Sequence, residues 1–114
     1  MSLPASKPLD LYRGDTFPLA ARIWTDAIDG TPADLTGVEA RAELRADPGD
    51  ALILAMACTV ELPNIVHVNI AADAWPDAVP AKARWDLELT YPSGAVRTIL
   101  AGPVRIVDDV TVLP

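Results

Sequence analysis

The sequence predicts an all-β fold, an antiparallel β-sandwich of about seven or eight short strands with at most one short helical turn. Three observations predict it. The 114 residues are the size of a single domain. Eleven prolines and six glycines divide the chain into short segments. Several of these segments alternate apolar and polar side chains, which is typical of strands that are buried on one face and solvated on the other.

The N-terminal third is expected to contribute two strands. Residues 9–12 are a short apolar segment that ends at the turn Arg13-Gly14-Asp15. Residues 16–25 alternate next, and Pro18 places them at a sheet edge or a strand start because proline cannot donate to a ladder. Asp29-Gly30 is a strong turn dipeptide.

The middle of the chain continues the strand pattern. Residues 38–46 alternate alanine, valine or leucine with Glu or Arg, which favours a half-buried strand over the helix that the same residue types would support. Residues 51–62 are apolar and fit two short strands or one bent strand. Pro63-Asn64 turns the chain, and residues 65–70 alternate again. Residues 71–78 are expected to hold a single helical turn, which Pro76 and Pro80 keep short.

The C-terminal third contains the clearest strand. In residues 83–91 the side chains of Trp85, Leu87, Leu89 and Tyr91 share one face. Residues 92–94, Pro-Ser-Gly, signal a hairpin. Residues 95–100 pair back, Gly102-Pro103 interrupts, and residues 104–107 form the last strand.

This spacing predicts an Ig-like sandwich in architecture only, because the Cys…Trp…Cys signature of immunoglobulin domains is absent. The expected organisation is an N-terminal extension in residues 1–8, the sandwich in residues 9–110 and a tail in residues 111–114.

Composition excludes several functional classes. The net charge is −7, which disfavours nucleic-acid and membrane binding because an acidic surface repels phosphate groups. No apolar run is long enough to cross a bilayer, and no signal peptide is expected at the N-terminus. The one cysteine, Cys58, rules out an internal disulfide framework.

Residues able to carry catalysis are sparse. His67 is the only histidine, and Ser2 and Ser93 are poor nucleophile candidates because one is terminal and the other lies in a hairpin. Cys58 has apolar neighbours that predict a buried, unreactive thiol. We therefore expect no catalytic residue and no enzyme activity; a small hydrolase would depend on His67 alone.

Metal and ligand motifs are also weak. The acidic spots Asp108-Asp109 and Asp47…Asp50 do not follow the spacing of a calcium loop, so no metal site and no cofactor are expected. A loose calcium site at Asp108-Asp109 is the alternative. The tripeptide at residues 13–15 matches an integrin motif, but without an export signal a tight turn is the better interpretation.

Three aromatic residues are candidates for an interface. Tyr12, Trp24 and Trp75 fall outside the clear apolar faces, and exposed aromatic residues are frequent anchors of protein–protein contacts. Trp85, in contrast, lies on an apolar face and is expected in the core.

Three segments, taken together, carry a family resemblance. They are residues 11–17 (LYRGDTF), residues 29–37 (DGTPADLTG) and residues 85–89 (WDLEL) with Ser93-Gly94 and Gly102. Their order over residues 9–110 resembles the N-terminal β-sandwich domain of phage and prophage baseplate and tail-fibre proteins, of the baseplate upper protein type. Family members often continue into long fibre regions, whereas this chain stops at Pro114, so a small tail or neck accessory protein is an equal expectation.

The resemblance implies a non-enzymatic structural protein that docks onto other tail or virion subunits, with a homo-oligomer as a further expectation. It also implies a cytoplasmic protein during assembly that becomes part of the virion tail. The alternative is a small bacterial carbohydrate- or protein-binding module, which would show a cleft with exposed aromatic residues.

Overall fold

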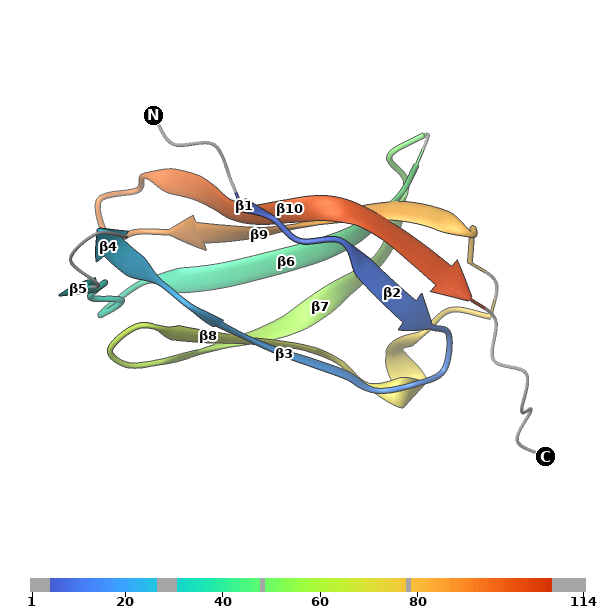
Figure 1. Ribbon diagram of the computed structural model, residues 1–114, viewed down its shortest axis with the longest axis horizontal. Coiled ribbons are helices and arrows are strands. Elements are labelled where there is room, and N and C mark those ends of the chain that lie inside the picture. The colour runs from blue at the N-terminus through green and yellow to red at the C-terminus, as the bar shows by residue number, and fades with distance from the viewer. Residues whose placement is uncertain (1–4, 27–30, 48, 78, 108–114) are drawn as a thin grey trace.

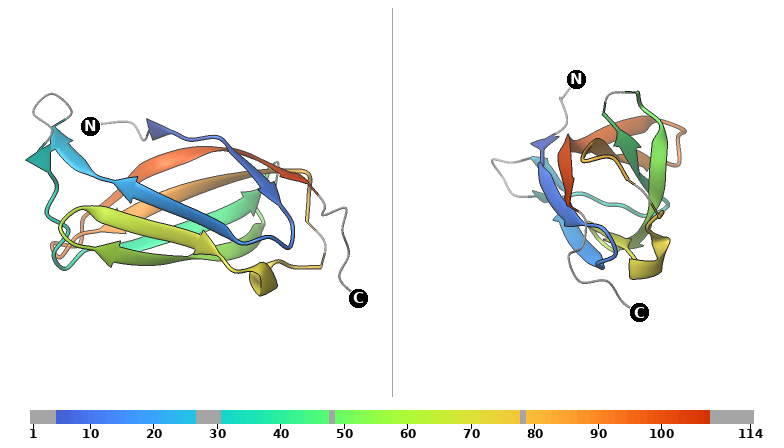
Figure 2. Two further views of the ribbon diagram at one scale, coloured as in Figure 1. Left: turned by 60° about the horizontal axis from the view of Figure 1, so that its bottom comes forward. Right: turned by 90° about the vertical axis from the view of Figure 1, so that its right-hand side faces the viewer.

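The computed structural model describes residues 5–26, 31–47, 49–77 and 79–107, and it shows strands curled around one core (Figures 1 and 2). The elements are β1 (Ala5–Ser6), β2 (Leu9–Tyr12), β3 (Phe17–Arg22), β4 (Trp24–Asp26), β5 (Thr31–Pro32), β6 (Glu39–Ala46), β7 (Leu52–Glu61), β8 (Ile65–Ile70), the 3₁₀ turn η1 (Ala72–Ala74), β9 (Lys82–Thr90) and β10 (Val96–Val107). The predicted all-β class and the single helical turn in residues 71–78 are confirmed.

The order of the strands is that of an Ig-like sandwich. One side of the curled sheet runs β10-β9-β6 and the other runs β7-β8-β3, and all neighbours in these two series are antiparallel. The strands β3, β6, β7, β8, β9 and β10 follow one another along the chain as strands B, C, D, E, F and G of an immunoglobulin domain do. The two series therefore correspond to G-F-C and D-E-B. The Ig-like β-sandwich predicted from strand spacing is therefore confirmed by topology.

Strand β7 joins the two sides of the sandwich. Its first half pairs with β6, with Met56 opposite Ala42, and its second half pairs with β8, with Cys58 opposite Val68. The apolar segment 51–62 is thus one continuous strand that changes partner partway along, not two strands. Because its alternate residues stay inward throughout, Leu54 and Met56 reach the same core as the β8 residues.

The core is lined by the alternating residues that the sequence placed on apolar faces. Val38, Ala42 and Leu44 are buried, and so are Trp85, Leu87 and Leu89 of β9. On β8 the buried set is Val66, Val68 and Ile70. A helix over residues 38–46 is excluded, because β6 pairs on both sides, with β7 and with β9.

The segment 16–25 divides into two strands. β3 is an edge strand that pairs only with β8, so the edge position predicted from Pro18 is confirmed. After Ile23, β4 leaves the main sheet and pairs with β5 in a small hairpin. The predicted turn dipeptide Asp29-Gly30 lies outside the described residues.

The N-terminal residues pair in parallel with β10. β1 aligns Ala5 with Leu100, and β2 aligns Leu9 with Val104. β1 lies within residues 1–8, the stretch expected as an extension, so part of that stretch belongs to the sheet. Between β1 and β2 the ladder is interrupted at Lys7 and Pro8, because neither residue has a register partner on β10.

The expected interruption at Gly102-Pro103 is wrong, because β10 runs unbroken from Val96 to Val107. Ala101 O accepts from Lys7 N and Val107 O accepts from Arg13 N, so odd-numbered residues of β10 face β1 and β2. The backbone nitrogen of Pro103 therefore faces the gap between β1 and β2. Because no ladder hydrogen bond is formed in that gap, the missing N–H of proline is not needed there. A proline at that position does not break the strand.

Candidate functional site

The three aromatic residues proposed as interface anchors lie at two ends of the molecule. Tyr12 and Trp75 line one shallow pocket where β2 turns into β3, together with Asp10, Leu11, Asp15, Thr16 and Phe17. Trp24 belongs to β4, at the opposite end of the long axis (Figure 1). The side chain exposures of Tyr12 and Trp24 are 53% and 48%, and Trp75 is half-buried.

A tight turn positions the Tyr12–Trp75 pocket. Asp15 N donates to Tyr12 O at 3.1 Å, and Gly14 adopts a φ of +94°, a left-handed conformation that favours glycine. Trp75 Nε1 donates to Asp15 O at 2.9 Å, which fixes the indole from a segment 60 residues away. The tripeptide Arg13-Gly14-Asp15 is therefore a structural turn, as the sequence predicted.

The end that carries Trp24 holds two further exposed apolar side chains that sequence reasoning did not single out. Leu62 precedes the β7–β8 turn and is 57% exposed, and Val96 begins β10 at 56%. Ile23 N donates to Asn64 O and Leu35 N donates to Pro63 O, so the chain on both sides of the β4–β5 hairpin is tied to the β7–β8 turn. The sequence signal that could have identified Leu62 and Val96 is their position beside the predicted turns at Pro63-Asn64 and at residues 92–94.

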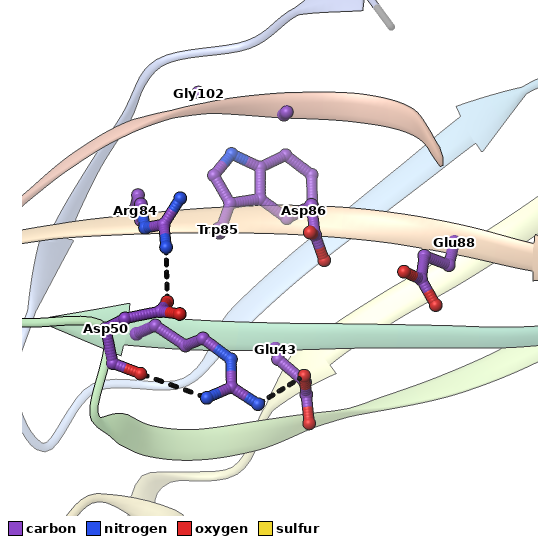
Figure 3. A pocket seen from close by; sticks show the side chains of 9 residues that line it. Glu43, Asp50, Arg84, Trp85, Asp86, Glu88 and Gly102 are labelled. Atoms are coloured by element: carbon purple, nitrogen blue, oxygen red, sulfur yellow. Dashed lines mark hydrogen bonds and ion pairs between the residues drawn. The ribbon is translucent and has the colours of Figure 1, made fainter. Parts of the chain in front are cut away.

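The outward face of β6 and β9 is charged and slightly hollowed (Figure 3). Cross-strand register places Glu43 opposite Asp86 and Arg45 opposite Arg84. Like charges directly opposite destabilise a sheet. Here ion pairs with other side chains compensate part of the repulsion, because Arg45 pairs with Glu43 at 2.9 Å and Arg84 pairs with Asp50.

Asp86 lies on this face beside other acidic side chains. Partial burial raises its pKa, and the neighbouring carboxylates of Glu88 and Glu43 raise it further. The hydrogen bond from Arg45 instead lowers the pKa of Glu43. Figure 3 shows the Asp86 and Glu88 side chains following one another along β9. The lining of this hollow therefore carries more acidic than basic side chains, and it includes neither a histidine nor a nucleophile.

His67 lies on the outward face of β8. Its Nε2 is 2.7 Å from Glu61 Oε1, and both side chains are well exposed. The structure brings neither Ser93 nor an acidic cluster to it. Over the described ranges, no group of three or more His, Cys, Asp or Glu side chains is arranged to hold a metal ion.

Cys58 is a half-buried thiol in β7. Burial raises its pKa, and its Sγ donates weakly to Met56 O at 3.8 Å. A raised pKa keeps the sulfur protonated and poorly nucleophilic at neutral pH. Of the acidic spots named from the sequence, Asp50 is engaged by Arg84, while Asp108-Asp109 lies outside the described residues. No helix in the described part of the chain has the length and apolar character of a membrane span.

The residues of the DLTG segment act locally, as their types suggest. Asp34 Oδ1 accepts from the Thr36 N–H at 3.0 Å and from its hydroxyl at 2.6 Å, and these two bonds lower the pKa of Asp34. Gly37 follows with a φ of +76°, and a side chain there would meet Pro92. The segment thus sets the entry into β6.

No protein-family model matches the sequence, and no curated protein sequence is significantly similar to it. Among solved structures, the chain is similar to the SrpA adhesin R347E mutant of Streptococcus sanguinis, with 16% identity, a TM-score of 0.49 and coverage of 90% of this chain. It spans 55% of the adhesin chain. It is also similar to murine CRIg (10% identity, TM-score 0.42, coverage 91% and 93% of the two chains).

A further similar structure is the strand-swapped dimer of the mouse leukocyte-associated immunoglobulin-like receptor 1 extracellular domain. The identity is 11%, the TM-score is 0.40, and 99% of this chain and 97% of that chain are covered. The assignment of the fold rests on the strand order described above.

Proposed function

We propose that this chain is a non-enzymatic structural protein of a phage or prophage tail, a baseplate or neck accessory component that acts by docking onto other subunits. The observation that carries the proposal is the set of motifs in residues 11–17, 29–37 and 85–89. The described residues of these motifs lie at the β2–β3 turn, at β5 and the entry to β6, and in the centre of β9.

The structure favours docking through the ends of the sandwich rather than through its edges. The β3 edge carries Pro18 at its second position, and proline protects an edge from strand addition. The β10 edge is already covered by β1 and β2. Five large hydrophobic side chains stay exposed among the described residues: Tyr12, Trp24, Leu52, Leu62 and Val96. Exposed apolar and aromatic residues of this kind serve as interface anchors.

Other tail or virion subunits are the proposed partners, and copies of this chain are a further candidate. The net charge of −7 supports protein partners over nucleic acid or anionic lipid. The protein would act in the cytoplasm during assembly and in the virion tail afterwards.

Particles purified from the host after prophage induction test the proposal directly. We expect mass spectrometry to find the chain in purified particles, and deletion of its gene to yield particles with incomplete tails. A double variant, Trp24→Ser with Leu62→Ser, should reduce incorporation, while Ala55→Ser, an exposed change in the middle of β7, serves as the control. Absence from particles, with complete infectious virions in the deletion strain, would contradict the proposal.

A further inference from the structure

We infer that the pocket between Tyr12 and Trp75 receives a cationic side chain, arginine or lysine, from a partner subunit. The inference deepens the docking function proposed above by naming the chemistry of one contact. It is independent of the Trp24 end of the molecule, which lies at the other extreme of the long axis (Figure 1).

Two aromatic side chains from distant segments meet at this pocket, and one is held rigidly. Trp75 has its only polar atom, Nε1, committed to Asp15 O at 2.9 Å, so the indole cannot turn without losing that bond. Tyr12 ends β2 with its side chain 53% exposed, while Leu11 beside it is buried in the core. A cation positioned over such rings is attracted by their π-electrons, and a fixed ring lowers the entropy lost on binding.

Carboxylates complete the lining. Asp10 and Asp15 both border the pocket, from the outward face of β2 and from the β2–β3 turn. Within the described ranges, no ion pair engages the Asp15 side chain. Asp10 is paired with Arg105, so the Asp15 carboxylate is the one left for a partner's cation. The net charge of −7 attracts such a partner from a distance.

The molecule itself shows that a guanidinium is accepted at this rim. Arg105 Nε lies 3.2 Å from Asp10 Oδ1, with both side chains 70% exposed. A second guanidinium arriving from a partner would find Asp15, Tyr12 and Trp75 in the lining of the same pocket. A sugar ring also stacks on aromatic side chains, but, being neutral, it gains nothing from the charge of Asp15.

NMR titration of the ¹⁵N-labelled protein with small probes tests the inference. The probes are the capped tripeptide Gly-Arg-Gly, the neutral tripeptide Gly-Gln-Gly and methyl β-glucoside, each at low salt. We expect saturable shifts at Gly14, Asp15 and the Trp75 indole N–H with the arginine peptide alone. The dissociation constant should be on the order of 1–10 mM, and it should rise with added NaCl.

Variants separate the pocket from general acidic attraction. Tyr12→Leu and Asp15→Asn should each weaken arginine binding by about fivefold. Trp24→Ser, equally exposed at the far end, should leave it unchanged. Equal shifts with the glutamine peptide, shifts with the glucoside alone, or wild-type affinity in both pocket variants would overturn the inference.

The particle experiment decides the docking function separately. If the protein is found in particles but its pocket does not bind the arginine peptide, only the cation inference is overturned. A chain that binds the peptide as described but is absent from particles overturns only the proposed tail function.

Discussion

Trp85 Nε1 donates to Lys7 O at 2.8 Å, a bond between a core residue of β9 and the interruption between β1 and β2, 78 residues apart in sequence. Gly102 makes the approach possible. A side chain Cβ at this position would lie 2.5 Å from Lys7 O, closer than such atoms approach. Gly102 therefore has a packing reason, because the backbone of Lys7 occupies the space where its side chain would be.

Gly102→Ala is expected to destabilise the protein by about 1–3 kcal/mol, because the new methyl group pushes Lys7 O away from the indole. Urea unfolding followed by tryptophan fluorescence measures the loss. Arg97→Ala, an exposed change on the same strand, is the control and should alter the free energy of unfolding by less than about 0.5 kcal/mol.

Trp85→Phe isolates the hydrogen bond from the packing. The phenyl ring keeps most of the buried apolar area, but Lys7 O loses its donor, so we expect a loss of about 1–3 kcal/mol from the missing bond and the smaller ring. In a double-mutant cycle with Gly102→Ala the two losses should be less than additive, because either change alone separates the same pair of groups. Full additivity would mean that the bond is intact in the Gly102→Ala protein.

Pro18→Thr is expected to let the β3 edge pair with the edge strand of another copy of the protein. Ile23 N donates to Asn64 O of the β8 side, so by alternation residues 18, 20 and 22 turn their backbone groups to the free edge. Replacing proline restores a donor there. Light scattering after size exclusion should show increased self-association at high concentration. Ala20→Thr, exposed on the same strand and already carrying its N–H, should not increase association to the same extent.

Asp86→Asn is expected to stabilise the protein at neutral pH, by on the order of 0.5 kcal/mol, because it removes one member of the Glu43–Asp86 pair. The pKa of Asp86 is raised in the folded state, so the folded state binds its proton more tightly than the unfolded chain does. The destabilisation from Asp86 is thus fully present above the pKa of Asp86 in the folded state. It is lost as the pH falls below the ordinary pKa that Asp86 has in the unfolded chain. Urea midpoints of the two proteins should converge in acid, and a constant difference would contradict this account.

Asp34→Ala tests the opposite sign. The pKa of Asp34 is lowered by its bonds to Thr36, so this carboxylate stabilises the fold above its ordinary pKa, and the stabilisation is lost as the pH falls through the lowered folded pKa. The variant should be less stable than the wild type at pH 7, with a smaller difference in strong acid. Thr36→Ala removes only the hydroxyl that donates to Asp34 and keeps the backbone N–H bond, so its loss of stability should be smaller than that of Asp34→Ala.

The sequence alone determined the strands, because alternation with a period of two decides which side chains turn inward. Alternate residues of two segments face the core as the pattern required: Val38, Ala42 and Leu44 in one, and Trp85, Leu87 and Leu89 in the other. Pro18 indicated the edge because it lacks a backbone donor. The turn at Gly14 and the local bonds of Asp34 were also predictable, because they involve neighbours only a few residues away.

Tertiary structure alone decided the rest, because it depends on residues that are distant in the chain. A proline inside β10 is tolerated only where it faces the gap between β1 and β2, and one strand, β7, serves both halves of the sandwich. Pairing register, not composition, set Glu43 against Asp86 and brought Trp75 to the turn after Tyr12. Local preference fixes the direction of a side chain, whereas its neighbour across the fold is fixed only when the sheets close.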